Sequence, residues 1–261
     1  MRNFTFKGLF LAIVFIVLGS LSIQAADGLI TKQITIKLEK AGTLPDKIGS
    51  TKKFQITNLK IIGEINGTDL RMIREMAGKD AWGSKTDGML SVLDLSDAKI
   101  VEGGDYYYTD YPYYSTYYST SNDKIGDYTF YGCSVLTSLT LPSGLTEIGE
   151  GAFRDCSGLT SIYVYTEKLP KMGRDVFWGC DAKKCTVYVP KGTYDDYWLS
   201  EFGYFENIVE LDPTGINNVI TSNDAKELSR YSLNGQRLSA PTKGLNIVKY
   251  SDGSVKKVVV Q

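Results

Sequence analysis

Three consecutive blocks of the chain share one pattern of hydrophobic and polar positions. The blocks open at Ile125, Ile148 and Met172, so the period is 23 and then 24 residues. The second, sixth and ninth residues of the blocks are glycine, phenylalanine and cysteine: Gly126, Phe130 and Cys133; Gly149, Phe153 and Cys156; and Gly173, Phe177 and Cys180. Each block then carries two apolar residues two positions apart: Leu139 and Leu141, Ile162 and Val164, and Val187 and Val189. This alternation predicts one short strand per block.

A unit of this length with a single strand cannot bury its apolar side alone. We therefore expect the units to stack into a right-handed leucine-rich-repeat solenoid, an α/β fold whose strands form a parallel sheet. The third pair of apolar residues sits one position late, which indicates a one-residue insertion in that unit. The predicted core comprises Ile125, Phe130, Cys133, Leu136, Leu139, Leu141, Ile148, Phe153, Cys156, Leu159, Ile162, Val164, Met172, Phe177, Val187 and Val189.

The blocks resemble the BspA-type leucine-rich repeats of proteins exported by Bacteroides and its relatives, whose units read roughly IGxxAFxxCxxLxxLxLPxxLxxI. The resemblance is close over residues 125–190 and looser on either side. It departs at Tyr165, where the family has proline, and at Lys183, where the two preceding units have leucine. The resemblance implies a cell-surface protein that adheres to host proteins or to neighbouring cells.

Weaker copies of the strand pattern precede the blocks. Leu59–Ile65 and Leu90–Ser96 each predict a strand, and Thr68–Ala77 predicts a helix between them, which Gly78 ends. The sequon at Asn66 is interpreted as a turn.

The ends of the solenoid have patterns of their own. Ile30–Leu38 predicts an edge strand, because apolar residues alternate along it. Residues 193–205 predict a short closing helix and turn, whose tyrosines and Trp198 are expected to cover the last rung.

The N-terminus carries the features of an export signal. Positive charge precedes an unbroken apolar run of 11 residues, Gly8–Leu18, and small residues lead to Ala25, where we expect cleavage. A run of this length is shorter than the roughly 20 residues that span a bilayer, so no membrane span is expected after cleavage. We expect an exported protein at the cell surface or outside the cell, with the periplasm as an alternative.

The C-terminal segment predicts a small β module. Leu228–Leu233, Gly244–Tyr250 and Val255–Val260 form a predicted three-strand meander with turns at Asn234-Gly235 and Asp252-Gly253. The segment resembles the sorting modules of type IX secretion, and a simple end cap or spacer is an equal alternative. The expected domains are a signal peptide (1–25), an N-terminal cap (26–58), the solenoid (59–211) with a tyrosine-rich insertion at about 101–124, a linker (212–222) and the β module (223–261).

Composition narrows the chemistry. The chain has no histidine, which excludes Ser-His and Cys-His nucleophiles and histidine metal ligands. A net charge of -1 gives no reason to expect nucleic-acid binding. The repeated cysteines are expected to be free, buried thiols, with a Cys180–Cys185 or rung-to-rung disulfide as the alternative. No metal or cofactor is expected.

Two pairs of carboxylates could in principle serve glycoside hydrolysis. Asp94 with Asp97 and Asp195 with Asp196 stand in no recognisable catalytic frame, and we expect all four to be solvated surface residues. An acid-catalysed hydrolase is therefore only a third hypothesis, and the chain is predicted not to be an enzyme.

A tyrosine-rich segment interrupts the repeat pattern. It holds eight tyrosines in 13 residues: Tyr106, Tyr107, Tyr108, Tyr111, Tyr113, Tyr114, Tyr117 and Tyr118. Tyrosine gives a large contact area and a hydroxyl group at small entropic cost, so these residues are predicted to bind a ligand, and a tolerated, mobile insertion without a ligand is an equal alternative. Leu95 and Ile125 are 30 positions apart, whereas the equivalent Leu141 and Ile148 are 7 apart, and the excess of 23 equals one full coil. A degenerate coil is therefore the alternative to an insertion that protrudes from the solenoid.

From the insertion we predict that deleting residues 106–118 leaves stability nearly unchanged while ligand binding falls. The leading hypothesis for the ligand is a protein, from the host matrix or from another cell surface. A glycan held by the tyrosines is the alternative.

Overall fold

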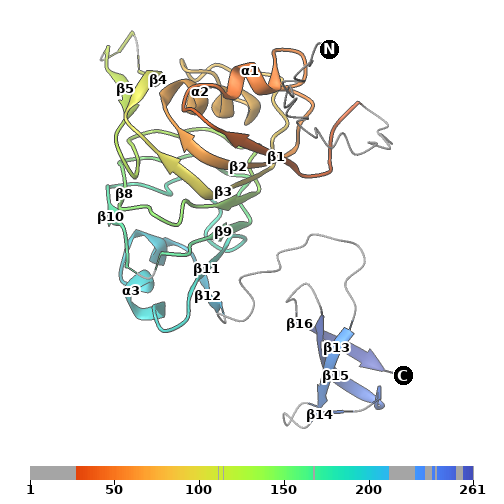
Figure 1. The fold of residues 1–261 in the computed structure, drawn as a ribbon. Coiled ribbons are helices and arrows are strands. Elements are labelled where there is room, and N and C mark those ends of the chain that lie inside the picture. Colours follow the sequence, from red (N-terminus) through yellow and green to blue (C-terminus); the bar gives the residue numbers. More distant parts are fainter. Residues whose placement is uncertain are drawn as a thin grey trace, which may run out of the picture.

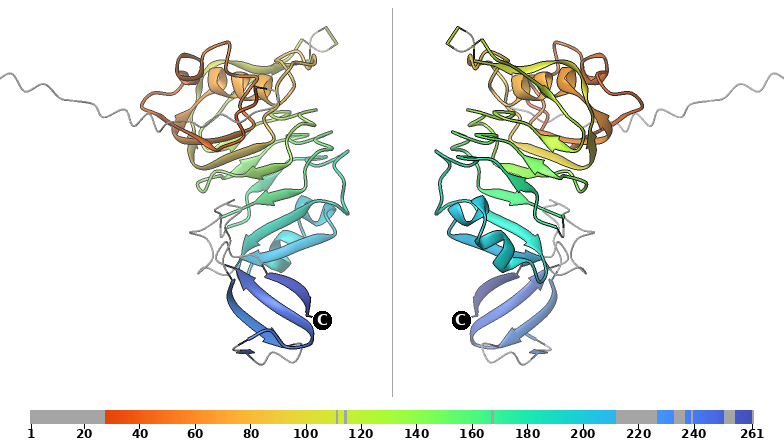
Figure 2. Two further views of the ribbon diagram at one scale, coloured as in Figure 1. Left: turned by 90° about the vertical axis from the view of Figure 1, so that its right-hand side faces the viewer. Right: turned by 90° about the vertical axis from the view of Figure 1, so that its left-hand side faces the viewer.

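The computed structural model describes residues 28–110, 112–113, 115–166, 168–211, 227–232, 237–238, 240–250 and 255–260. Up to Leu211 the chain winds as successive coils stacked along one axis (Figures 1 and 2). The predicted signal peptide, the linker and the two β-module turns lie outside the described residues.

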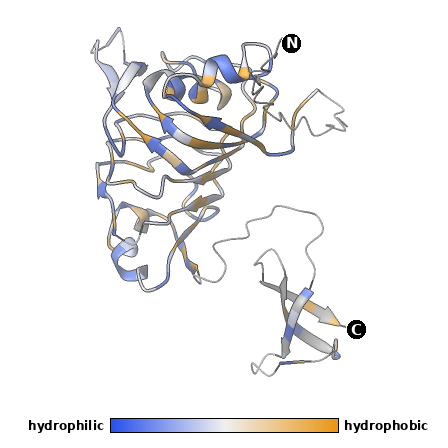
Figure 3. Ribbon diagram, viewed as in Figure 1, coloured by the Kyte–Doolittle hydropathy of each residue, from blue (hydrophilic) through white to orange (hydrophobic). Residues whose placement is uncertain are grey.

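A seven-stranded parallel sheet forms one side of this stack. Its order is β1 (Ile34–Leu38), β2 (Asn58–Ile65), β3 (Val92–Ile100), β7 (Ser138–Thr140), β9 (Ser161–Tyr163), β11 (Thr186–Pro190) and β12 (Asn207–Leu211). Equivalent repeat positions lie side by side, since Leu139 pairs with Ile162 and Ile162 with Val187. Hydrophobic and hydrophilic residues alternate along the larger strands (Figure 3). The predicted solenoid with a parallel strand stack is confirmed.

A second parallel sheet forms another side of the coils. It contains β6 (Lys124–Ile125), β8 (Glu147–Ile148) and β10 (Lys171–Met172). Backbone hydrogen bonds also join the loops of neighbouring coils: Phe130 N–H donates to the Ala152 carbonyl at 2.7 Å, and Phe153 N–H to the Val176 carbonyl at 2.9 Å. Each coil therefore satisfies backbone groups of the next.

The core runs through the middle of the coils. The rings of Phe130, Phe153 and Phe177 stack at 5.5 and 5.7 Å between neighbouring centroids, almost parallel to one another. Fifteen of the sixteen predicted core residues are buried. The exception is Met172, which is partly buried against the core.

The four cysteines are free and buried in the structure. The Sγ–H of Cys156 donates to the Phe130 carbonyl at 3.0 Å, and that of Cys180 to the Phe153 carbonyl at 3.3 Å. Burial raises the pKa of both thiols. The interpretation as buried thiols is confirmed, and the disulfide alternative is not what the structure contains.

Two helices cover the N-terminal coils, α1 (Leu44–Ile48) and α2 (Gly67–Met76). The expected turn at the sequon is instead the N-cap of α2: the Asn66 side chain accepts a hydrogen bond from Thr68 N–H, and the Asp69 side chain accepts one from Asn66 N–H. Asp69 is buried and also accepts from Gly42 N–H and Leu44 N–H, which ties the β1–α1 loop to the helix.

The closing segment contains α3 (Tyr194–Trp198) and a 3-10 helix (Glu201–Tyr204). Tyr197 and Phe202 are fully buried against the last coil. The expectation that Trp198 covers the last rung is wrong, because its side chain is 45% exposed and lies beside Tyr194 at the surface.

The C-terminal residues form an antiparallel sheet of four strands in the order β14 (Arg237–Leu238), β13 (Glu227–Ser232), β15 (Gly244–Tyr250) and β16 (Val255–Val260). The predicted meander has one strand fewer, because the two residues of β14 carry no alternation that a sequence pattern could detect. Arg230 is buried and pairs with Glu227 at 2.7 Å.

Candidate functional site

The tyrosine-rich insertion forms a hairpin of β4 (Gly103–Thr109) and β5 (Tyr117–Thr120). Since β3 pairs directly with β7, the residues between them add no strand to the seven-stranded sheet. The hairpin extends beyond the coils at one side of the stack (Figures 1 and 2). It is therefore an insertion between rungs rather than a degenerate rung.

The base of the hairpin belongs to the core. Tyr107 is 1% exposed, and its hydroxyl donates to the Asp127 carbonyl at 2.9 Å. That hydroxyl occupies the space in front of Gly126, whereas the equivalent Gly149 faces the preceding coil around Asp127. The hairpin thus takes the place of a preceding coil at this side of the first repeat. The prediction that the insertion lies outside the core is wrong for Tyr107 and for Tyr108, which is 9% exposed.

A buried arginine fixes the hairpin to α2. The Arg74 guanidinium lies over the Tyr108 ring, 4.9 Å from its centroid. It donates to the carbonyls of Thr129 at 2.8 Å, Tyr128 at 3.1 Å and Asp80 at 3.1 Å. Among the residues that the structure describes, no carboxylate lies within ion-pair distance of it. Three carbonyl dipoles and an aromatic face therefore replace a counterion.

Beside this arginine the hairpin and the first two repeats line an open pocket of about 530 Å³, which we call the tyrosine pocket. Its rings form a continuous cluster, with Tyr118 5.7 Å from Tyr108 and 5.3 Å from Tyr128 between ring centroids. The residues that line it are Tyr108, Asp110, Thr116, Tyr118, Tyr128, Tyr131 and Arg154.

Tyr128 enters this pocket from a strained backbone position. Its φ is +55°, and the equivalent residues of the next two units, Gly151 and Asp175, also have positive φ. Glycine and aspartate adopt this region more readily than a bulky residue. The Tyr128 ring lies against Gly151, and its hydroxyl donates to Glu150 at 2.9 Å. Strain of this kind concentrates at functional sites.

The electrostatics of the pocket favour neutral tyrosines. Removal from water, with nearby carboxylates as a smaller cause, raises the pKa of the Tyr118 and Tyr128 hydroxyls to about 12. Asp110 is held in place by Thr116 N–H, which donates to it at 2.7 Å. No carboxylate of the described chain lies within ion-pair distance of Arg154. The pocket therefore offers aromatic faces, neutral hydroxyl groups, one anchored carboxylate and one unpaired cation.

The stability of the folded protein should fall as the pH rises from about 10 toward 12. Tyrosines of an unfolded chain ionise near pH 10, whereas burial raises the pKa of Tyr107 and Tyr128 to about 12. Between these values the unfolded state binds fewer protons, so raising the pH favours unfolding, while below pH 10 both states are protonated and the effect is absent. Urea unfolding midpoints measured on both sides of pH 10 test this. The decline should be shallower for Tyr128→Phe, and an identical decline would contradict it.

On its other side the hairpin carries an exposed aromatic group, which we call the outer aromatic face: Arg71, Trp82, Tyr106 and Tyr117. The Arg71 guanidinium lies 5.1 Å from the Trp82 ring centroid and 5.0 Å from that of Tyr106. Tyr117 meets Tyr106 edge-on at 4.9 Å. Trp82 is 51% and Tyr117 58% exposed.

The predicted tyrosines are thus divided among different environments. Tyr106 and Tyr117 lie on the outer aromatic face, Tyr108 and Tyr118 line the tyrosine pocket, and Tyr107 is buried. Tyr113 is 86% exposed near the tip, and Tyr111 and Tyr114 lie outside the described residues.

Sequence reasoning missed the partners of the hairpin. Arg71, Arg74 and Trp82 precede the repeats and carry no periodic signal. Tyr128 and Tyr131 could have been noticed, because they stand at repeat positions whose residue type varies between units and are tyrosines only in the first repeat. A search for aromatic residues at variable repeat positions would have found them.

The carboxylate pairs have different surroundings. Asp195 and Asp196 are exposed in the first turn of α3, as expected. The expectation that Asp94 is merely solvated is wrong: it pairs with Lys60 at 3.1 Å, and Asp97 pairs with the same Lys60 at 2.7 Å. Within the described ranges no cluster of three or more acidic or cysteine residues is arranged to hold a metal ion.

Comparison with protein families bears on the repeats. Residues 123–239 match the model of the BspA-type leucine-rich repeat region, in six copies. The match begins just before β6 and leaves the hairpin outside, so only Tyr128, Tyr131 and Arg154 of the tyrosine pocket fall within it. No curated protein matches the chain. None of the helices in the described ranges is long and apolar enough to cross a membrane.

Proposed function

We propose that the protein is an exported, non-catalytic cell-surface protein that binds another protein through the outer aromatic face. The match to BspA-type repeats supports a surface protein-binding role. The observation that carries the proposal is the exposure of Trp82 and Tyr117 around a half-buried arginine, Arg71. Tryptophan, tyrosine and arginine are the residues enriched at interface hot spots.

Arg71 is prepared for binding. Two aromatic rings hold its guanidinium, which reduces the side-chain entropy that a partner would have to remove. No carboxylate within the described ranges lies at ion-pair distance, so its N–H groups can donate to a carboxylate of the partner. The proposed partner, a host matrix or other cell-surface protein, therefore presents an acidic residue beside an apolar surface.

Mutation of the outer aromatic face should weaken binding without weakening the fold. Partners are first captured with the mature protein from host matrix, mucus and bacterial surface extracts, and their affinities are then measured. Trp82→Ala and Tyr117→Ala should each reduce affinity by roughly thirtyfold, about 2 kcal/mol. Tyr113→Ala, which removes a more exposed tyrosine between the same two strands and outside the outer aromatic face, is the control. Equal affinity of all three variants and the native protein would refute the proposal.

Export and the absence of catalysis are parts of the same proposal with separate tests. Export with cleavage near Ala25 is tested by sequencing the N-terminus of protein recovered from the cell surface. The β module as a sorting signal is tested by deleting residues 223–261 and following secretion. A panel of polysaccharides should remain intact with pure protein, and cleavage of any of them would show an enzyme.

A glycan in the tyrosine pocket is the second candidate. A pocket that combines aromatic faces with neutral hydroxyl groups and an anchored carboxylate, Asp110, suits a sugar, whose apolar face stacks while its hydroxyl groups hydrogen-bond. Binding on a glycan array that is lost in Tyr118→Ala and retained in Tyr117→Ala would favour this candidate.

A further inference from the structure

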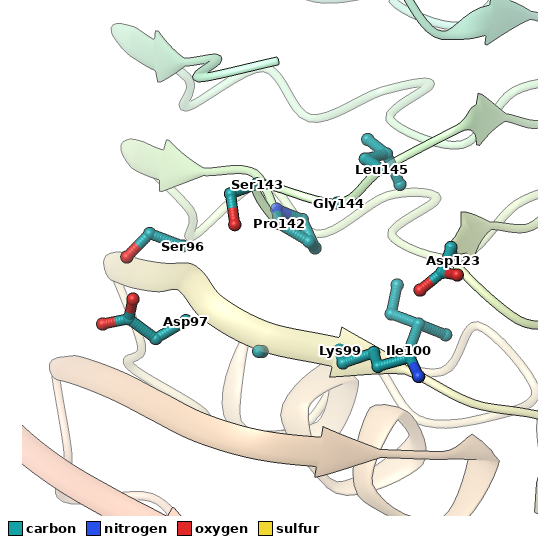
Figure 4. Close-up of a pocket in the computed structure, with 10 residues that line it drawn as sticks. Ser96, Asp97, Lys99, Ile100, Asp123, Pro142, Ser143, Gly144 and Leu145 are labelled. Carbon is teal, nitrogen blue, oxygen red and sulfur yellow. The ribbon is translucent and has the colours of Figure 1, made fainter.

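Strand β3 extends beyond its neighbour β7, and the difference in length leaves a groove. β3 continues to Ile100, whereas β7 ends at Thr140 and its chain turns away. The second half of β3 therefore has β2 on one edge and a space of about 360 Å³ on the other (Figure 4). Its walls are residues 96–100, Asp123 and the turn of residues 142–145.

Two backbone hydrogen bonds mark the ends of the free edge of β3. Ser143 N–H donates to the Ser96 carbonyl at 3.3 Å, and Asp123 N–H donates to the Ile100 carbonyl at 2.8 Å. On the opposite edge, Val101 N–H donates to the Ile65 carbonyl of β2. Backbone groups of a strand alternate between its two edges, so residues 96, 98 and 100 face the groove.

Ala98 consequently directs its N–H and C=O into the groove, and Ile100 directs its N–H there. No residue in the described ranges donates to or accepts from these three groups. The Ala98 residue is only 6% exposed. Buried backbone groups are paired in the great majority of cases, so these groups can pair with the backbone of a further chain that enters the groove.

We propose that this groove binds a short extended segment of a partner protein, which pairs with the backbone of Ala98 and Ile100. In a parallel pair, one residue of the incoming strand donates its N–H to the Ala98 carbonyl and accepts from the Ile100 N–H through its own carbonyl. Only this residue of the segment pairs with β3, because the Ser96 and Ile100 carbonyls already accept from Ser143 and Asp123; the contact is a minimal form of strand addition, and the flanking residues leave the edge. The site is separate from the outer aromatic face and does not depend on the function proposed for it.

The walls define the chemistry of the segment. Pro142 and Leu145 supply apolar surface along the turn (Figure 4). The Asp123 side chain stands at the Ile100 end and has no ion-pair partner within the described ranges, whereas Asp97 is neutralised by Lys60. The groove therefore suits a segment with small or apolar residues and a lysine or arginine at one end.

Gly144 allows the groove to be blocked without disturbing the fold. A Cβ atom built at Gly144 meets no other atom within 4 Å, and its backbone is not in the left-handed region. Gly144→Trp should therefore fill the groove with its indole ring. Lys168 lies in the corresponding turn one repeat later and is exposed, so Lys168→Trp adds the same ring to an equivalent turn outside the groove.

The experiment selects peptides that need the groove. A phage-displayed library of random heptapeptides is panned on the mature protein with counter-selection on Gly144→Trp. Enriched peptides are synthesised and titrated by fluorescence anisotropy. Affinity should fall at least about tenfold for Gly144→Trp and remain unchanged for Lys168→Trp and for Tyr117→Ala.

Two further readouts test backbone pairing directly. N-methylation of the one peptide amide that pairs with Ala98 should lower affinity at least about tenfold, and peptide binding should slow hydrogen exchange at the amides of Ala98 and Ile100. Neither readout requires the tryptophan variant to fold. Failure to enrich any groove-dependent peptide, or peptides that tolerate N-methylation at every position and leave these amides unprotected, would overturn the proposal.

Discussion

Replacing Arg74 with alanine should lower the free energy of unfolding by about 3–5 kcal/mol, through a cavity and through carbonyls left without a donor. The substitution removes a buried cation whose N–H groups are bound to three carbonyls. The Thr129 carbonyl then loses the partner that the structure shows for it, and an unpaired buried carbonyl costs roughly 1–3 kcal/mol. The Tyr108 ring loses the guanidinium above it, and a cavity opens between α2 and the hairpin.

Arg71→Ala is the matched control for this prediction. Arg71 lies one helical turn before Arg74, also contacts aromatic rings, and is only half buried. Its loss should cost no more than about 1 kcal/mol. Urea unfolding of the two variants measures the difference, and a thermal midpoint roughly 6–20 °C lower is expected for Arg74→Ala. Equal stability of the two variants would show that the buried arginine does not hold the hairpin.

Tyr107→Ala should destabilise the protein by about 3–5 kcal/mol, whereas Tyr117→Ala should change stability by less than about 1 kcal/mol. Both residues belong to the same hairpin, but Tyr107 is 1% and Tyr117 58% exposed. Tyr107 also fills the space before Gly126 and donates to the Asp127 carbonyl. Tyr107→Phe isolates that hydrogen bond and should cost about 1 kcal/mol.

The contacts of Tyr107 and Tyr108 overturn the expectation that deleting the tyrosine-rich segment leaves stability nearly unchanged. Removing residues 106–118 takes Tyr107 and Tyr108 out of the core, so it should unfold the first repeat and the α2 region rather than leave stability nearly unchanged. Hydrogen exchange would show this loss as faster exchange in α2 and in the first repeat. If the deletion variant kept native protection there, the hairpin would not be the surface that closes the first repeat.

These stability effects decide which variants can report on binding. Loss of binding in Tyr107→Ala would carry no information about recognition, because the fold around the hairpin changes with it. Tyr117→Ala and Trp82→Ala change exposed side chains and leave the core contacts in place. Only the second kind of variant separates a binding role from a structural one.

The repeat pattern by itself determined the solenoid. Equivalent residues such as Phe130, Phe153 and Phe177 recur at a fixed spacing, and the alternation around Leu139 and Ile162 fixes which side of each strand faces inward. Both signals are local, because a coil contacts only its neighbours and every unit repeats the same contacts. The parallel sheet and the burial of the repeated phenylalanines and cysteines therefore followed from the order of the residues, whereas the structure was needed to show that the thiols are free.

Only the tertiary structure decided the role of the tyrosine-rich segment. Tyr107 and Tyr117 are both tyrosines with tyrosines next to them in the sequence, yet Tyr107 is buried and Tyr117 is exposed. Tyr107 is buried because it packs against the first repeat, where its hydroxyl donates to the carbonyl of Asp127, 20 residues later in the sequence. Contacts over such separations obey no short period, so alternation cannot reveal them.

The groove beside β3 has the same origin. The strand pattern at Leu93 and Leu95 looks like that of any other rung, and the sequence does not show that β3 continues past the end of β7. Whether the backbone of Ala98 finds a partner depends on the length of a neighbouring strand more than 40 residues later. The local sequence pattern thus determines which side chains each coil buries. The packing of adjacent strands of different length determines which backbone groups remain available for binding.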